Sequence, residues 1–131
     1  MMEKEGVVSL WLGNISTNEF LNDYVEIKYT EDGEWEPSEF LKDFKIDIDD
    51  IDEDFIEKVR YEEKLDSIES LLQGCSYEEI IIPKIINIIG NKVGKEINTV
   101  ILVYNLEYSG SNIKVNNDKY SMEYICSIEY K

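Results

Sequence analysis

The sequence contains no histidine, and this absence removes more chemistry than any other feature of its composition. Histidine is the commonest general base and the commonest zinc ligand, so the usual catalytic triads are missing too. Arg60 is the only arginine, which leaves little for bidentate capture of phosphate or carboxylate groups. No glycine-rich phosphate loop occurs. These absences argue against an enzyme and predict neither catalytic residues nor a cofactor.

Cysteine is scarce, with only Cys75 and Cys126. A zinc site made of cysteine alone would need four thiolates, and two cysteines do not make the disulfide framework of a secreted domain. Both have apolar neighbours, so we expect two reduced, buried thiols.

Long hydrophobic runs are also missing, because no apolar stretch approaches the roughly 18 residues of a membrane helix. The amino terminus, MMEKEG, lacks the basic region and apolar core of a signal peptide. We therefore expect a cytoplasmic protein that has no membrane partner.

Basic residues are few: the chain has 13 basic and 29 acidic residues, which gives a formal net charge of -16. Such a chain repels nucleic acids and anionic membranes at long range, and the same field attracts basic proteins. The hydrophobic fraction of 43% is ordinary for a globular protein, so the charge does not indicate disorder. The length predicts one domain over residues 1–131.

The strongest structural signal is Thr99–Tyr108, TVILVYNLEY, which is rich in β-branched and aromatic residues and contains neither glycine nor proline. Because strand side chains alternate, one face would carry every second residue from Val100 to Tyr108, and Ile101 and Val103 would lie on the other. We predict a central strand with a strand on each side and helices over at least one face.

Two further strands are predicted, at Val7–Leu12 and at Tyr120–Tyr130, with a turn at Gly13 and Asn14 after the first. The short connection that follows Thr99–Tyr108 favours antiparallel pairing of that strand with the last one.

Helices are indicated by cap signals that precede apolar residues at helical spacing. The expected N-terminal caps are Ser16, Asp66 and Ser76, and Pro37-Ser38 can open another short helix. The last of these helices is rich in isoleucine, and its core-facing residues should be Ile81, Ile82, Ile85, Ile86 and Ile89. Pro83 should kink this helix or move its start, and Gly90 and Gly94 should mark its end. The fold class is therefore α+β, a mainly antiparallel sheet packed by several short helices and one isoleucine-rich helix.

Carboxylates concentrate in the middle of the chain. Residues 26–63 hold 16 acidic and five basic residues, so their net charge is -11. The densest run is Asp47–Asp54, DIDDIDED, which we interpret as an exposed loop. It does not match a calcium-binding EF-hand, because counting from Asp47 puts Asp52 where glycine is needed and Lys58 where a bidentate glutamate is needed. The segment Phe55–Tyr61, which follows, fits a strand or a helix, and we favour a strand.

This charge suggests a docking surface for a basic partner, although a merely solubilising surface would look the same. Four aromatic residues accompany it, as interface anchors or as core residues: Tyr29, Trp35, Phe44 and Tyr61. A turn is expected at Glu31-Asp32-Gly33. The candidate partner-binding residues are Glu31, Asp32, Glu34, Trp35, Glu36, Asp47, Asp49, Asp50, Asp52, Glu53 and Asp54.

Five short blocks, taken in order, resemble a known family. They are VSLWLGN at Val8–Asn14, EDGEWEPSEFLKDF at Glu31–Phe44, DEDFIE at Asp52–Glu57, LLQGCSYEE at Leu71–Glu79 and NTVILVYNLEY at Asn98–Tyr108. In this order they resemble the immunity protein 22 family of bacterial polymorphic-toxin systems, with weaker similarity in the last strand.

The resemblance implies a protein that binds a co-encoded toxin, often a nuclease, and blocks it without any activity of its own. Its partner would be the C-terminal domain of the cognate toxin, which we expect to be basic. Two other hypotheses use the same carboxylates. One is an acidic mimic of nucleic acid that regulates a host DNA-binding protein. The other is an enzyme that uses carboxylates, with or without a divalent metal, and the absence of histidine argues against it.

Overall fold

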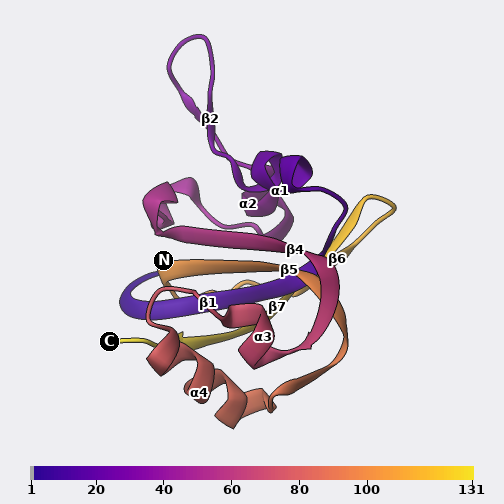
Figure 1. Cartoon of the computed structure of the whole chain (residues 1–131). Coiled ribbons are helices and arrows are strands. Elements are labelled where there is room, and N and C mark those ends of the chain that lie inside the picture. Colours follow the sequence, from indigo (N-terminus) through magenta and orange to yellow (C-terminus); the bar gives the residue numbers. More distant parts are fainter. Residues whose placement is uncertain (1) are drawn as a thin grey trace.

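The computed structural model describes residues 2–131 and is built around an antiparallel sheet of five strands in the order β4-β5-β1-β7-β6 (Figure 1). The strands of this sheet are β1 (Glu3–Ile15), β4 (Ile56–Ser67), β5 (Lys92–Leu106), β6 (Lys114–Asn116) and β7 (Tyr120–Glu129). A separate two-stranded hairpin consists of β2 (Lys28–Tyr29) and β3 (Trp35–Glu36). Together with the helices, this confirms the predicted α+β class.

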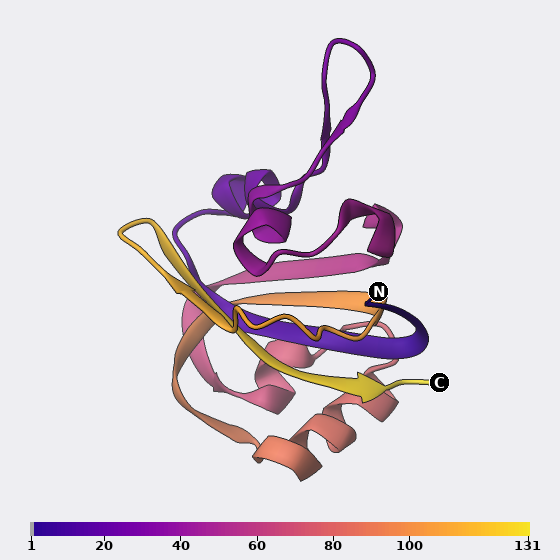
Figure 2. The same ribbon diagram turned by 180° about the vertical axis from the view of Figure 1, so that it is seen from behind.

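Helical layers cover both faces of the sheet, as the front and back views show (Figures 1 and 2). One layer contains α1 (Asn18–Val25), α2 (Glu39–Phe44) and the two 3-10 turns η1 (Ile48–Asp50) and η2 (Glu53–Phe55). The opposite layer contains α3 (Ile68–Leu72) and α4 (Glu78–Ile89). Each layer closes its own hydrophobic cluster against the sheet.

The predicted central strand is confirmed, because β5 lies between β4 and β1. Val100 and Leu102 pack towards α3 and α4, and Ile101 packs towards α1 and α2, as alternation requires. The predicted alternation is wrong beyond Tyr104. Asn105 has a φ of 62°, in the left-handed region, and this single residue moves the following apolar side chains to the α1 and α2 side.

The predicted pairing of the last strand with Thr99–Tyr108 is wrong. Strand β7 pairs with β1, which lies between β5 and β7. The physical reason is that Val7–Leu12 is buried throughout, and a strand that is apolar on both faces is most stable between two others.

The predicted turn at Gly13 and Asn14 is also wrong, since both residues lie inside β1. A side chain at Gly13 would place its Cβ 2.0 Å from the carbonyl oxygen of Ser121 in β7. Glycine is therefore needed here for close strand packing rather than for a turn.

The three predicted helix caps are each wrong by one residue. Helix α1 is capped by Thr17 and α3 by Ser67, whereas α2 opens at Pro37-Ser38 as expected, with Ser38 as its cap. Helix α4 begins after Tyr77 and has no side-chain cap, because the hydroxyl of Ser76 donates instead to Glu57, at 3.0 Å. Tertiary hydrogen bonds thus compete with the local capping pattern.

The isoleucine-rich helix α4 runs through Pro83 without a change in its start. Ile81 and Ile85 are buried as predicted, whereas Ile89 is 39% exposed, so its assignment to the core is wrong. Gly90 ends the helix with a φ of 85°, but Gly94 lies within β5.

Candidate partner-binding surface

The hairpin of β2 and β3 projects from the body of the molecule beyond α1 and α2 (Figure 1). Its turn is at the predicted position, where Gly33 has a φ of 81°. Thr30 closes the tip: its amide donates to the carbonyl of Glu34 at 2.7 Å, and its hydroxyl accepts from the amide of Glu34 at 3.1 Å. The tip therefore has a defined conformation although little of the protein surrounds it.

Two aromatic rings lie on this hairpin and are exposed. Tyr29 is 55% and Trp35 is 53% exposed, and their ring centroids are 4.6 Å apart. Large exposed rings that pack mainly on each other are typical anchors of protein interfaces. Phe44, by contrast, is fully buried against Trp11, so it belongs to the core.

The hairpin is also acidic. Its exposed carboxylates are Glu31, Asp32, Glu34 and Glu36. The ion pairs found within residues 2–131 join Lys4 to Glu107 and Lys95 to Glu123, and neither involves the hairpin. The carboxylates at the tip are therefore free to meet a basic partner.

The second acidic segment, Asp47–Asp54, is more ordered than the predicted loop, since it forms η1 and η2. The carboxylates of Asp47 and Asp52 cap these turns, accepting from the amides of Asp49 and Asp54 at 2.9 Å each. The side chains of Asp49, Glu53 and Asp54 are exposed.

Asp50 does not fit the predicted exposed loop. It is only 7% exposed, and its carboxylate accepts a hydrogen bond of 3.1 Å from the amide of Met2. The flanking Ile48 and Ile51 pack against the core and draw Asp50 inwards. This carboxylate therefore ties the start of the chain to η1 and is a poor candidate for partner binding.

Glu26 joins the two acidic segments, and the sequence analysis missed it. It lines a hollow of about 420 Å³ together with Glu53 and Asp54, and a second hollow of about 230 Å³ at the base of the hairpin together with Glu36. Glu26 is the C-terminal cap of α1, where the helix dipole disfavours a carboxylate. That unfavourable placement was the sequence signal that could have indicated a function.

The hairpin thus adjoins the layer that contains η1 and η2, and Glu26 lies between the hairpin and the η1–η2 segment. We call this the acidic surface. Its exposed members are Glu26, Glu31, Asp32, Glu34, Trp35, Glu36, Asp47, Asp49, Asp52, Glu53 and Asp54. Within residues 2–131 there is no cluster of three or more potential metal ligands. The arrangement suits electrostatic binding of a large partner.

A partly buried polar cluster holds this layer against the sheet. Asp43 in α2 accepts a hydrogen bond of 2.9 Å from the hydroxyl of Tyr24 in α1, and a second from Tyr120 in β7. Burial and the nearby carboxylate raise the pKa of Tyr120 to about 12 and that of Tyr24 further. Both phenols therefore stay neutral and donate, which fixes α1 and α2 beneath the acidic surface.

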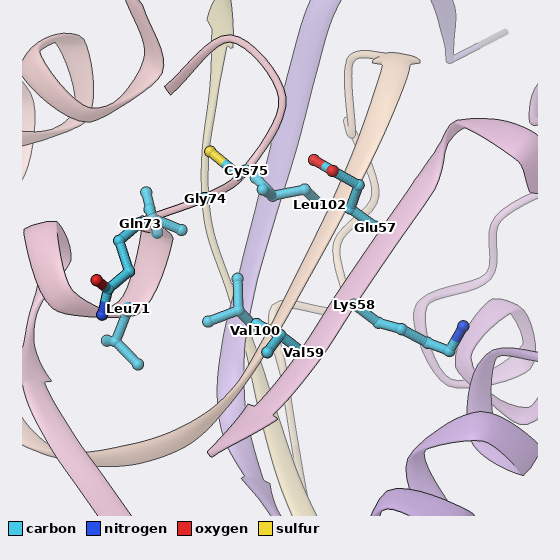
Figure 3. A pocket seen from close by; sticks show the side chains of 10 residues that line it. Glu57, Lys58, Val59, Leu71, Gln73, Gly74, Cys75, Val100 and Leu102 are labelled. Atoms are coloured by element: carbon cyan, nitrogen blue, oxygen red, sulfur yellow. The ribbon is translucent and has the colours of Figure 1, made fainter. Parts of the chain in front are cut away.

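The opposite layer contains a cavity of about 180 Å³ between β4 and the loop from α3 to α4 (Figure 3). Glu57 lies at its rim and accepts from the hydroxyl of Tyr104, which also contacts the carbonyl of Ser76 at 2.8 Å. Burial, with a smaller effect of the Glu57 carboxylate, raises the pKa of the Cys75 thiol to about 11. A thiol held in its protonated form is a poor nucleophile, so Cys75 does not indicate catalysis.

Comparison with protein-family models shows that residues 8–131 match the model described as Immunity protein 22. The chain belongs to the immunity protein 22 family. The resemblance predicted from five short blocks is confirmed, and the match includes the last strand. No curated protein and no solved structure gives a significant match.

Membership of this family assigns the chain a role in immunity to a toxin. Among the helices described between residues 2 and 131, none is long and apolar enough to cross a membrane.

Proposed function

We propose that this immunity protein neutralises its cognate toxin by docking the acidic surface onto a basic, nuclease-type toxin domain. The observation that carries the proposal is the projecting hairpin, which presents uncompensated carboxylates next to two exposed aromatic rings. Family membership favours a toxin over a host DNA-binding protein as the partner. We expect the encounter to take place in the cytoplasm.

The proposed inhibition is steric and electrostatic. A nuclease binds the phosphate backbone through basic side chains, so the field of a protein with a net charge of -16 accelerates its encounter with such a domain. Once docked, the hairpin carboxylates lie where phosphates would bind and exclude the nucleic acid. No chemical step by the immunity protein is required.

The test is the association rate with the toxin domain encoded beside this gene, measured by stopped flow against ionic strength. The hairpin variant E31Q/D32N/E34Q loses three charges from exposed positions. The control E69Q/E79Q/E96Q loses the same number of charges from exposed positions on α3, α4 and β5. We expect the hairpin variant to associate roughly tenfold more slowly at low salt and the control to change much less.

The difference should shrink as salt rises, because the Debye length falls from about 10 Å at 0.1 M to about 3 Å at 1 M. Equal rates for the wild type and the hairpin variant at every salt concentration would show that the docking surface lies elsewhere. Equal slowing by both variants would show that only net charge matters. Asp50 is left unchanged, since its carboxylate is buried and bonded to Met2.

A further inference from the structure

Strand β4 forms one edge of the main sheet, and among residues 2–131 its pairing partner is β5 alone. The amide of Ile56 donates to the carbonyl of Glu53, but within residues 2–131 no backbone hydrogen bond reaches the outer edge of β4 over residues 57–61. Such an edge presents a row of free N–H and C=O groups, and an extended chain that lies alongside can pair with them.

Two hollows flank this edge, one on each face of the sheet. Glu57 and Val59 face the cavity beside α3, whose apolar lining comes from Leu71, Leu72, Val100 and Leu102. Figure 3 shows Glu57 and Val59 on this side of β4 and Lys58 pointing the other way. On that other side lies the hollow lined by Lys58 and by three carboxylates, which outnumber its single positive charge: Glu26, Glu53 and Asp54. The two hollows therefore differ in chemistry: one is mainly apolar, and the other has a net negative charge.

We propose that β4 is the edge to which the toxin adds an extended segment with alternating apolar and basic side chains. This inference rests on the proposed function, since its occupant is the same basic toxin domain. An added strand would direct successive side chains to opposite faces. Every second side chain would then reach the apolar cavity, and the others would meet the carboxylates of Glu26, Glu53 and Asp54.

The net charge of the protein favours a toxin segment over a second copy of the chain as the occupant of the β4 edge. Two copies would each bring a net charge of -16, which opposes their association. A basic segment is attracted by the same field, and Glu26 connects the edge directly with the acidic surface. The toxin would therefore contact both surfaces in a single complex.

Hydrogen exchange tests the main-chain pairing directly. Amide exchange of the wild-type protein is measured by NMR, free and bound to the toxin domain encoded beside its gene. We expect alternate amides of residues 57–61 to exchange at least about tenfold more slowly in the complex, because strand addition pairs every second N–H on an edge. A complex that forms without this protection overturns the β4 proposal and leaves the proposed function standing. If no complex forms, the proposed function itself fails.

A pair of variants tests the side-chain contacts. Val59→Glu places a carboxylate at the mouth of the apolar cavity, at a position that is 38% exposed. Ile88→Glu makes the same kind of change at a 58% exposed position on α4. We expect Val59→Glu to weaken toxin binding at least about tenfold and Ile88→Glu to leave it unchanged. Thermal unfolding checks that both variants are folded, and equal affinities of the two folded variants would overturn the proposal. Protection of the β4 amides by dimers of the free protein would also overturn it.

Discussion

At the scale of single residues, Gly13 and Asn105 determine how closely two strands approach and which face of the sheet the side chains of β5 occupy. Gly13 lets β7 approach β1 closely, and Asn105 adopts a φ of 62° that reverses the facing of β5. The carbonyl oxygen of the Asn105 side chain accepts from the amide of Gly6 at 3.0 Å and from the hydroxyl of Tyr130 at 2.7 Å. Asparagine tolerates the left-handed region better than most residues, and these bonds hold it there.

Gly13→Ala should destabilise the protein strongly. The added Cβ would meet backbone atoms of Ser121 and Met122 at 2.0 and 2.9 Å, so the strands must separate. We expect a loss of about 3 kcal/mol or more in the free energy of unfolding, at or above the upper end of the usual cost of overpacking. Urea denaturation provides the measurement. The control is Gly74→Ala, which has open space but a φ of +82° and should cost roughly 1–2 kcal/mol. A Gly13→Ala variant as stable as the control would contradict the close approach.

At the scale of elements, the projecting hairpin contributes little to the core. Its strands have two residues each, and isolated hairpins are marginally stable in water. Tyr29 and Trp35 pack on each other while about half of each side chain stays exposed. We therefore expect the hairpin to serve partner binding rather than the stability of the fold.

Trp35→Ala should therefore separate binding from stability. We expect the free energy of unfolding to change by less than about 0.5 kcal/mol, as for an ordinary surface substitution. Dissociation from the toxin should become at least about tenfold faster, because a buried aromatic anchor is lost from the complex. Ile113→Ala, at a 56% exposed position, is the matched control. Unchanged dissociation of the Trp35 variant, measured by surface plasmon resonance, would remove this ring from the interface.

At the scale of the whole molecule, the groups whose pKa burial raises are two half-buried thiols and several phenols. Burial raises the pKa of both Cys75 and Cys126 from 9.0 to about 11, and that of Tyr120 from 10.0 to about 12. In each case the folded state binds the proton more tightly than the unfolded state does. The resulting stability is complete below the unfolded pKa and is lost as pH rises through the folded pKa.

The protein should consequently lose stability in mild alkali. We expect the urea midpoint to fall progressively from about pH 9 to about pH 12, first through the thiols and then through the phenols. Urea titrations at a series of pH values measure this. The variant Cys75→Ala/Cys126→Ala should lose the part of the decline that begins near pH 9 and keep the part that begins near pH 10. A midpoint that stays constant over this range would show that these groups are not protected in the folded state.

Much of the fold follows from local pattern. The β-branched run of β5 predicts a central strand, and Pro37-Ser38 predicts the start of α2. The sequence Glu31-Asp32-Gly33 predicts the turn of the hairpin. The charge of residues 26–63 predicts an acidic surface, and the exposure of Trp35 agrees with its place there. Partner binding by these residues stays a prediction.

Tertiary structure decided what local pattern does not encode. Strand β1 took the place between β5 and β7 because the choice of pairing partner depends on which strand loses most water on both faces. Asp50 became buried because Ile48 and Ile51 on either side of it pack into the core, and Glu26 joined the two acidic segments because α1 ends between them. The sequence by itself determined the elements and the sign of the surface charge, since both depend on neighbouring residues and composition. The order of the strands depends on contacts between distant segments, and so does which carboxylates stay exposed. These contacts form only when the helical layers pack on the sheet.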